Sequence, residues 1–248
     1  MRKILFALVI FFAATSGSSF KNTYTFEPVS VIELFTSQGC SSCPPADKLL
    51  AETITEAKKD GKKIFALSFH VDYWNRLGWI DPFSDKKYSQ RQSDYVSALN
   101  LNGAYTPQMI VNGTTQFVGS DKSSLSNALD KSFTTNAKAN FKTLTAKSVE
   151  GKSIHLQYSL DGEFSNSKIN FALVSLAETT IVKRGENGGR TLTNENIVRQ
   201  FISTQATSSG EIDFALSPLP TKNNQTIIAY IQRNSDLKIV GAATAELK

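Results

Sequence analysis

Hydrophobic and polar positions follow two different patterns along this chain, and the pattern changes near residue 135. Before that point, short apolar runs alternate with segments whose apolar residues recur at helical spacing. Residues 31–35 and 63–71 have the composition of buried strands, whereas residues 46–59 have the spacing of an amphipathic helix. A second helical stretch is expected over residues 83–99. The first part of the chain therefore predicts strands that alternate with helices.

The end of this first part adds a hairpin and a last helix. Two extended runs, residues 108–111 and 115–118, are separated by Asn112 and Gly113, and Asn-Gly between strands is a strong hairpin signal. Residues 123–132 predict the helix. The resulting order, β-α-β-α-β-β-α, is typical of a thioredoxin-like α/β domain. We assign this domain to residues 28–135.

The rest of the chain, residues 138–248, predicts strands without helices. Turn signals such as Asp161-Gly162 separate most of the extended runs. The runs are residues 141–148, 153–160, 169–182, 211–216, 225–232 and 238–245. Several short strands of this kind predict a β-rich, sandwich-like C-terminal domain. The expected fold class is thus α/β, with a thioredoxin-like domain followed by a β-rich one.

Residues 1–19 have the pattern of a secretory signal peptide. Arg2 and Lys3 precede an apolar stretch over residues 4–14, which small and polar residues follow. A membrane-spanning helix needs about 20 apolar residues, so this stretch is too short to be one. The sequence therefore predicts a periplasmic or secreted mature chain with no stable membrane span.

Charge narrows the range of partners. The chain has 27 Lys and Arg against 22 Asp and Glu, a formal net charge of +5. The basic residues do not alternate with aromatic residues along one face, so we expect no nucleic-acid partner. The length of 248 residues allows one large core or two smaller ones.

Both cysteines of the chain lie in residues 40–45 (CSSCPP), between the first predicted strand and the first predicted helix. A cysteine at a helix N-terminus faces unpaired N–H groups, which lower its pKa and favour the nucleophilic thiolate. We expect Cys40 to attack a partner and Cys43 to resolve the mixed disulfide. A structural framework would instead spread cysteines across distant segments, so a stabilising staple explains this pair less well.

Three further features are candidates for the same site. Thr106-Pro107 is expected to contain a cis peptide bond and to position the partner opposite the dithiol. His70 ends the second predicted strand, where it either stabilises the thiolate and transfers its proton or is an ordinary structural histidine. Glu33 lies seven residues before Cys40 and is a second candidate for proton transfer, although the face of the strand it occupies is open.

Other side chains are expected to have supporting roles. Trp74 and Trp79 are expected to pack near the site or to cover it. The polar loop at residues 184–190 (RGENGGR) is interpreted as a flexible connection between strands, with anion binding as the alternative. His155 is expected to be a structural residue at the surface.

Several motifs resemble the DUF1223 family of exported, thioredoxin-like bacterial proteins. The similar runs are residues 33–47 (ELFTSQGCSSCPPAD), 70–74 (HVDYW), 77–79 (LGW), 81–83 (DPF), 91–92 (RQ), 105–108 (YTPQ) and 184–187 (RGEN). The resemblance covers roughly residues 31–243 and implies a thioredoxin-like fold, a β-rich extension and a periplasmic location. It implies no substrate, because the family has no assigned function. Asn194 stands where many relatives have histidine.

These features predict an exported thiol–disulfide oxidoreductase that needs no cofactor. It would act on protein or small-molecule disulfides and would be recycled by a separate redox partner. Two alternatives stay open. One is a copper or other soft-metal handling protein that uses Cys40, Cys43 and His70. The other is a non-enzymatic binding module whose dithiol is a redox sensor or a staple.

Overall fold

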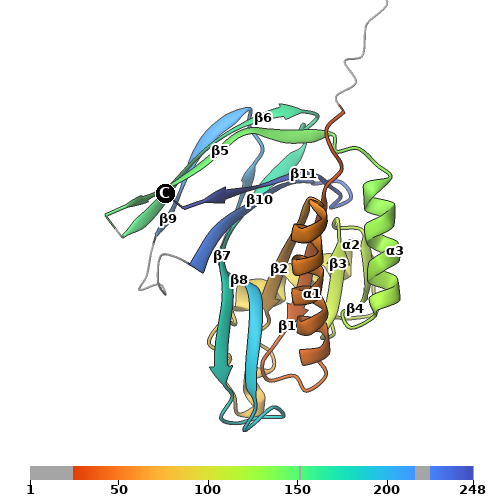
Figure 1. Ribbon diagram of the computed structural model, residues 1–248, viewed down its shortest axis with the longest axis vertical. Helices are drawn as coiled ribbons and strands as arrows, with labels where there is room; N and C mark the ends of the chain where they lie inside the picture. Colours follow the sequence, from red (N-terminus) through yellow and green to blue (C-terminus); the bar gives the residue numbers. More distant parts are fainter. Residues whose placement is uncertain (1–24, 151, 216–223, 248) are drawn as a thin grey trace, which may run out of the picture.

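An eight-stranded mixed sheet runs through the protein, and helices lie on both of its faces (Figure 1). The computed structural model describes residues 25–150, 152–215 and 224–247. The α/β class predicted from the sequence is confirmed. The predicted signal peptide, residues 1–19, lies outside the described residues. Within those residues, no helix is long and apolar enough to cross a membrane.

The first part of the chain supplies one half of this sheet and the helices. Its strands are β1 (Ser30–Thr36), β2 (Ile64–His70), β3 (Gln108–Val111) and β4 (Thr115–Val118). The helices are α1 (Pro44–Asp60), α2 (Lys86–Ala98) and α3 (Lys122–Phe133), with a short 3-10 helix, η1 (Asn75–Leu77). Strand β1 pairs in parallel with β2 and antiparallel with β3. The chain order is the one that the sequence pattern predicts.

Local sequence explains where the helices begin and end. Prolines occupy the first turn of α1, where a missing backbone N–H costs nothing, and Gly61 ends the helix with a positive φ of 65°. The side chain of Asp85 caps α2 by accepting a hydrogen bond from the backbone N–H of Lys87. Asp121 caps α3 in the same way. These signals place the N-terminus of α1 directly after the cysteine pair.

The C-terminal strands are divided between two sheets. They are β5 (Ala139–Val149), β6 (Ser153–Gly162), β7 (Ser167–Ile181), β8 (Thr191–Gln205), β9 (Ser209–Ala215), β10 (Gln225–Arg233) and β11 (Ile239–Glu246). Four of them continue the large sheet, whose order is β11-β10-β7-β8-β2-β1-β3-β4, and the others form a sheet of order β5-β6-β9. Strand β8 touches β2 through the pair Ser68 and Ile197. The sheet therefore crosses the boundary predicted near residues 135–138.

Strand β8 was not predicted from the sequence. Its polar run at residues 193–196 (TNEN) hides the alternation expected of a strand. Tertiary pairing overrides this local pattern, because β8 pairs along its length with β7. In Figure 1 the β7–β8 hairpin extends past the ends of the neighbouring strands, toward the end of α1 that carries the cysteines.

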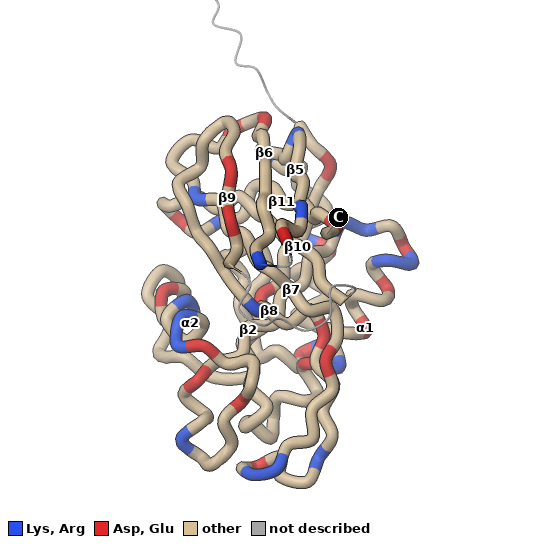
Figure 2. Tube along the Cα trace, turned by 90° about the vertical axis from the view of Figure 1, so that its left-hand side faces the viewer, with Lys and Arg blue, Asp and Glu red and all other residues tan. Residues whose placement is uncertain are grey.

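Alternate positions of the central strands pack against different helices. Ile32, Leu34 and Ala66 lie in the apolar cluster that α1 and α3 form with the sheet. Val31 and Phe35 lie in the cluster on the other face, with α2. Figure 2 shows α1 and α2 on opposite sides of the sheet. The three-stranded sheet packs over β7, β10 and β11 through a third apolar cluster.

Candidate functional site

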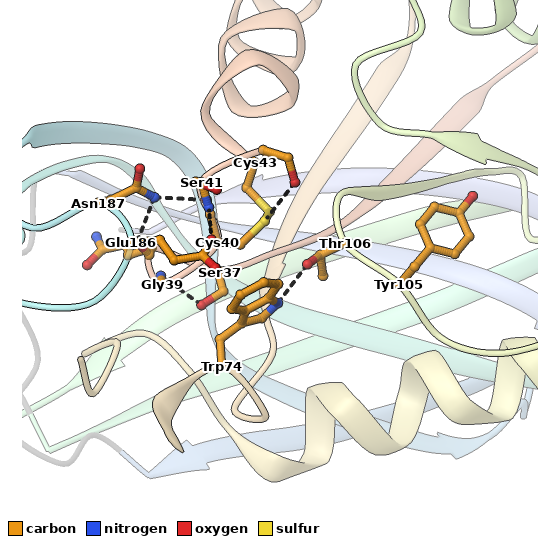
Figure 3. Close-up of a disulfide and its surroundings, with 12 residues drawn as sticks. Ser37, Gly39, Cys40, Ser41, Cys43, Trp74, Tyr105, Thr106, Glu186 and Asn187 are labelled. Carbon is orange, nitrogen blue, oxygen red and sulfur yellow. Dashed lines mark hydrogen bonds between the residues drawn. A yellow bond between two sulfur atoms is a disulfide. The ribbon is translucent and has the colours of Figure 1, made fainter. Parts of the chain in front are cut away.

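Cys40 and Cys43 form a disulfide at the N-terminus of α1 (Figure 3). The backbone N–H of Cys43 donates to the carbonyl of Cys40, and the N–H groups of Ala46 and Asp47 donate to the carbonyl of Cys43. The two cysteine residues have no solvent exposure. The pair thus has the helix-terminal position expected of a redox dithiol, but its sulfurs are covered.

The peptide bond between Thr106 and Pro107 is cis, as predicted. The Thr106 hydroxyl accepts a 2.7 Å hydrogen bond from the indole N–H of Trp74. Pro107 also approaches α1, since a Cβ placed on Gly119 would lie 3.1 Å from the Cβ atoms of both Pro107 and Ala46. Such a Cβ would also lie 2.8 Å from Cδ1 of Leu34, so the glycine avoids a clash and lets the cis-proline loop approach the helix.

Helix α2 holds this loop from the other face of the sheet. The side-chain amide of Gln92 donates to the backbone carbonyl of Tyr105 at 2.7 Å and to the side-chain oxygen of Gln108 at 2.8 Å. Its oxygen accepts a hydrogen bond from the hydroxyl of Tyr73. Gln92 is fully buried, so these bonds fix the residues on both sides of the Thr106-Pro107 pair.

The loop between β7 and β8 holds the cysteine loop in place. The side-chain amide of Asn187 donates to the carbonyls of Gln38 and Cys40 at 2.9 and 2.8 Å. The carboxylate of Glu186 accepts the backbone N–H of Ser41 at 3.0 Å, and Arg190 donates to the side-chain oxygen of Asn187. Residues 184–190 thus connect two strands, β7 and β8, as predicted, and the buried contacts of Asn187 hold this connection against the cysteine loop.

The two tryptophans contact the residues around the disulfide, as predicted. The Cβ atom of Trp74 would lie 3.2 Å from a Cβ placed on Gly39. The indole N–H of Trp79 donates to the side-chain oxygen of Gln38, and Gly185 packs against the Cβ of the same tryptophan. Both indoles therefore join the loop that follows β1 to the segments that cover it.

His70 forms a fully buried pair with Asp81. The imidazole Nδ1 lies 2.8 Å from a carboxylate oxygen of Asp81, and that oxygen also accepts the backbone N–H of Gln38. Burial opposes the charged imidazole, but the Asp81 carboxylate raises the pKa of His70 above its usual value. The His70 Nε2 atom is buried and has no hydrogen-bond partner among the described residues. His70 therefore keeps one nitrogen available beneath the site.

Asp47 is a buried carboxylate that the sequence did not bring to notice. It lies on α1 one turn after Cys43, and its Oδ1 atom has no hydrogen-bond partner in the described part of the chain. Burial raises the pKa of Asp47 to about 6, while His70 and the neighbouring Thr36 and Asn194 act in the opposite direction. Asn194 is itself buried and lies beside this acid.

Glu33 lies on the opposite face of the sheet. It shares the parity of Val31 and Phe35, which pack toward α2, whereas Cys43 lies at the start of α1. The guanidinium of Arg91 donates to both of its carboxylate oxygens, at 2.5 and 2.8 Å, and the hydroxyl of Tyr95 donates as well. The structure thus brings Glu33 together with Arg91 and places His70 on the α1 side.

The DUF1223 family, described as "Protein of unknown function", matches residues 31–232. The chain belongs to the DUF1223 family. No curated protein matches it. In this DUF1223 protein the matched residues include the cysteine pair, the cis-proline, His70 and the loop that carries Asn187.

One solved structure resembles this DUF1223 protein over most of its length. A crystal structure of an Agrobacterium tumefaciens protein has 29% identity and a TM-score of 0.65, over 88% of this chain and 94% of that chain. A domain of the outer membrane lipoprotein Omp28 from Porphyromonas gingivalis has 14% identity and a TM-score of 0.29, over 45% of this chain and 89% of that chain. A TM-score of 0.29 is too low to indicate a shared fold.

The site of this DUF1223 protein thus contains residues that were predicted and residues that were missed. The missed group comprises Asp47, Asp81 and Asn187. The part of the chain that the structure describes holds no group of three or more His, Cys, Asp or Glu side chains arranged to bind a metal ion. The metal-handling alternative, with Cys40 and His70 among its ligands, stays a prediction.

Proposed function

We propose that this DUF1223 protein is an exported thiol–disulfide oxidoreductase and that its first part is a thioredoxin-like unit. The carrying observation is the position of the Cys40–Cys43 disulfide at the N-terminus of a 17-residue helix. The positive end of the α1 helix dipole lies at Cys43 and favours a thiolate in the reduced protein. The cis bond before Pro107, in a loop that approaches the start of α1, supports the same function.

The exchange would proceed through a mixed disulfide at Cys40. In the oxidising direction, a substrate thiolate attacks the sulfur of Cys40, the bond to Cys43 breaks, and Cys43 leaves as a thiolate that takes up a proton. A second substrate thiol then attacks the substrate sulfur of the mixed disulfide and releases Cys40. The substrate loses two electrons and becomes a disulfide, and the cysteine pair becomes a dithiol. The reducing direction reverses each step.

The covered sulfurs restrict how a substrate can enter. Contact with the Cys40 sulfur requires a movement of neighbouring segments, and we expect the loop carrying Glu186 and Asn187 to move because it contacts the backbone of Cys40 and Ser41. The loop makes polar rather than apolar contacts with the backbone around Cys40. An extended substrate segment can replace such contacts with its own backbone hydrogen bonds, so we expect protein disulfides as the principal substrates.

The reduction potential of the cysteine pair tests this function. The protein without residues 1–19 would be equilibrated in glutathione buffers, and alkylated thiols would be counted by mass. A reversible two-electron transition between about −270 and −120 mV is expected of a redox catalyst. A disulfide that stays closed below about −300 mV would identify a structural staple and would contradict the proposal.

The burial of both sulfurs favours a second candidate, a redox-sensing binding module. In that case, opening of the disulfide would release Asn187 from Cys40 and alter the surface near α1. Capture of a protein partner by a Cys40→Ser variant as well as by the native chain, with no catalysis of disulfide exchange, would support it. Loss of exchange in that variant, with exchange in the native chain, would favour the enzyme.

A further inference from the structure

We propose that Asp47 takes the proton from the thiol of Cys43 when Cys43 closes the disulfide, and returns it when the disulfide opens. This inference rests on the proposed function, since it assigns a residue to one step of that exchange.

The geometry of α1 places the carboxyl group near Cys43. Residues four positions apart lie on the same face of a helix, and side chains of a helix lean toward its N-terminus. The Asp47 side chain therefore inclines toward Cys43, and its backbone N–H already donates to the Cys43 carbonyl at 3.1 Å. The 9% exposed fraction of Asp47 shows that this face is the buried one.

Hydrogen bonding satisfies the buried Asp47 carboxyl group only in part, since its Oδ1 atom has no partner among the described residues. A buried carboxylate usually accepts several hydrogen bonds, and one that lacks them is costly to the fold. The Oδ1 atom of Asp47, the hydroxyl of Thr36 and the Nε2 atom of His70 are all buried and unpartnered among the described residues. A carboxyl group kept in this condition is suited to exchange a proton rather than to hold a loop.

Charged and polar groups from every neighbouring element face the acid. Strand β1 contributes Thr36, strand β2 contributes His70, the loop after η1 contributes Asp81, and β8 contributes Asn194. The charged side chains of Lys48 on α1 and Glu195 on β8 line a groove beside Asp47. Asp81 occupies the Nδ1 side of the imidazole and raises the pKa of His70, which in turn favours the charged form of Asp47. Burial is the larger effect and keeps the pKa of Asp47 near 6, close to the working range of a general base.

Asp47 also has a route to solvent. It lines a groove of about 320 Å³ between α1 and the first residues of β8, together with Pro44, Lys48 and Thr193. A proton taken from Cys43 can therefore leave toward the groove without crossing the covered disulfide. The other predicted carboxylate, Glu33, has no such position, because it is paired with Arg91 on the far face.

The step balances as a proton transfer coupled to exchange. The sulfur of Cys43 attacks the sulfur of Cys40 in the mixed disulfide, and the bond between Cys40 and the substrate breaks. The Asp47 carboxylate accepts the Cys43 thiol proton as the new sulfur–sulfur bond forms. The substrate thiolate leaves and takes a proton from solvent. Asp47 then loses its proton through the groove. No electrons pass through the acid.

Dithiobis-nitrobenzoate separates the two sulfurs in one experiment. The reduced protein releases one coloured thiolate when Cys40 attacks the reagent and a second when Cys43 resolves the mixed disulfide. In Asp47→Asn we expect the second release to slow by about 100-fold at pH 7, with the first release nearly unchanged. Asp60→Asn, at the exposed end of the same helix, is the matched control and should behave as the native protein.

The pH dependence gives an independent measurement on the native chain. The rate of the second release should rise through pH about 6, as Asp47 becomes a carboxylate, and Asp47→Asn should lose this inflection. Equal rates and equal profiles in Asp47→Asn and Asp60→Asn would overturn the role of Asp47 and leave the oxidoreductase intact. If the reduced native protein released neither thiolate, the proposed function and this inference would both fail.

Discussion

Two buried charged clusters lie on opposite faces of the same sheet, and they differ in how completely their polar atoms are paired. On the α2 side, Arg91 donates to both oxygens of Glu33, and Tyr95 and Tyr230 share the same network. On the α1 side, Asp47 and the cluster around it keep unpartnered buried atoms. The charged groups of the α2 cluster are hydrogen-bonded, whereas Asp47 in the α1 cluster has an oxygen without a partner among the described residues.

The two clusters are suited to different roles, the paired one to structural support and the unpaired one to chemistry. A buried ion pair whose hydrogen bonds are complete can hold neighbouring elements in one arrangement, and here Arg91 also lies over the ring of Phe201 at 4.7 Å. Buried acids and imidazoles with unused atoms cost stability and persist where a reaction needs them. This contrast agrees with the role proposed for Asp47 on the α1 side, beneath the disulfide.

The largest expected effect comes from breaking the paired cluster. Replacement of Arg91 by leucine would leave the Glu33 carboxylate buried without its partner, and the free energy of unfolding should fall by about 3–5 kcal/mol. Urea unfolding measures it. The double variant Glu33→Leu with Arg91→Leu should lose less than Arg91→Leu alone, since no charge stays unpaired. A larger loss in the double variant would contradict this account of the cluster.

The unpaired cluster should respond in the opposite sense. The pKa of Asp47 is 3.8 in its ordinary state and about 6 in the folded protein, so folding binds a proton between these values and stability falls as pH rises through them. Above pH 6 the full cost is about 3 kcal/mol. Asp47→Asn should therefore unfold at higher urea than the native chain at pH 7.5, with the difference vanishing near pH 4. A variant less stable at pH 7.5 would show that interactions with His70, Thr36 and Asn194 outweigh the cost of burying the carboxylate.

The loop that carries Asn187 and contacts the cysteine loop should have an intermediate effect on stability. Asn187→Ala removes two hydrogen bonds to buried backbone carbonyls and should cost about 1–3 kcal/mol. The disulfide of this variant should also be reduced faster by a water-soluble phosphine, because the loop no longer holds the Cys40 backbone. Unchanged reduction in a folded Asn187→Ala protein would mean that another segment limits access.

A surface pair in the three-stranded sheet should have the smallest effect. The ring of His155 lies 2.7 Å from Asp213, and both side chains are reached by solvent. Exposed pairs contribute little, so His155→Asn should change the unfolding free energy by less than about 0.5 kcal/mol. A loss above 1 kcal/mol would show that this pair contributes more to stability than an exposed pair usually does.

The cysteine pair, the cis-proline and the first strands and helices could be predicted because each has a local signal. Turn residues, helix caps and the position of two cysteines are all visible along the chain. Glu33 was predicted as a candidate, but counting back from Cys40 could not give its face, since an irregular loop intervenes. The parity shared with Val31 and Phe35, which pack on the α2 side, gives the face directly.

Asp47 and the contact between Asn187 and the cysteine loop were harder to predict for physical reasons. An acid next to Lys48 in the first turn of a helix has the pattern of a solvated position, although its spacing from Leu50 and Ile54 places it on the buried face. Asn187 reaches the cysteine loop from a hairpin whose second strand, β8, has no clear local signal. Contacts between segments so far apart depend on the sheet order, which the sequence pattern does not contain.

The hydrogen bond between Asn187 and the Cys40 carbonyl joins residues 147 positions apart. This separation means that the cysteines are synthesised well before the residue that contacts them. A chain is synthesised from its N-terminus, so both cysteines emerge long before the hairpin that will cover them. During that interval the thiols are open to any oxidant, and the disulfide can form before the cover is in place. The newly made chain should thus be its most reactive form, and completion of the hairpin should be the step that ends free access to the sulfurs.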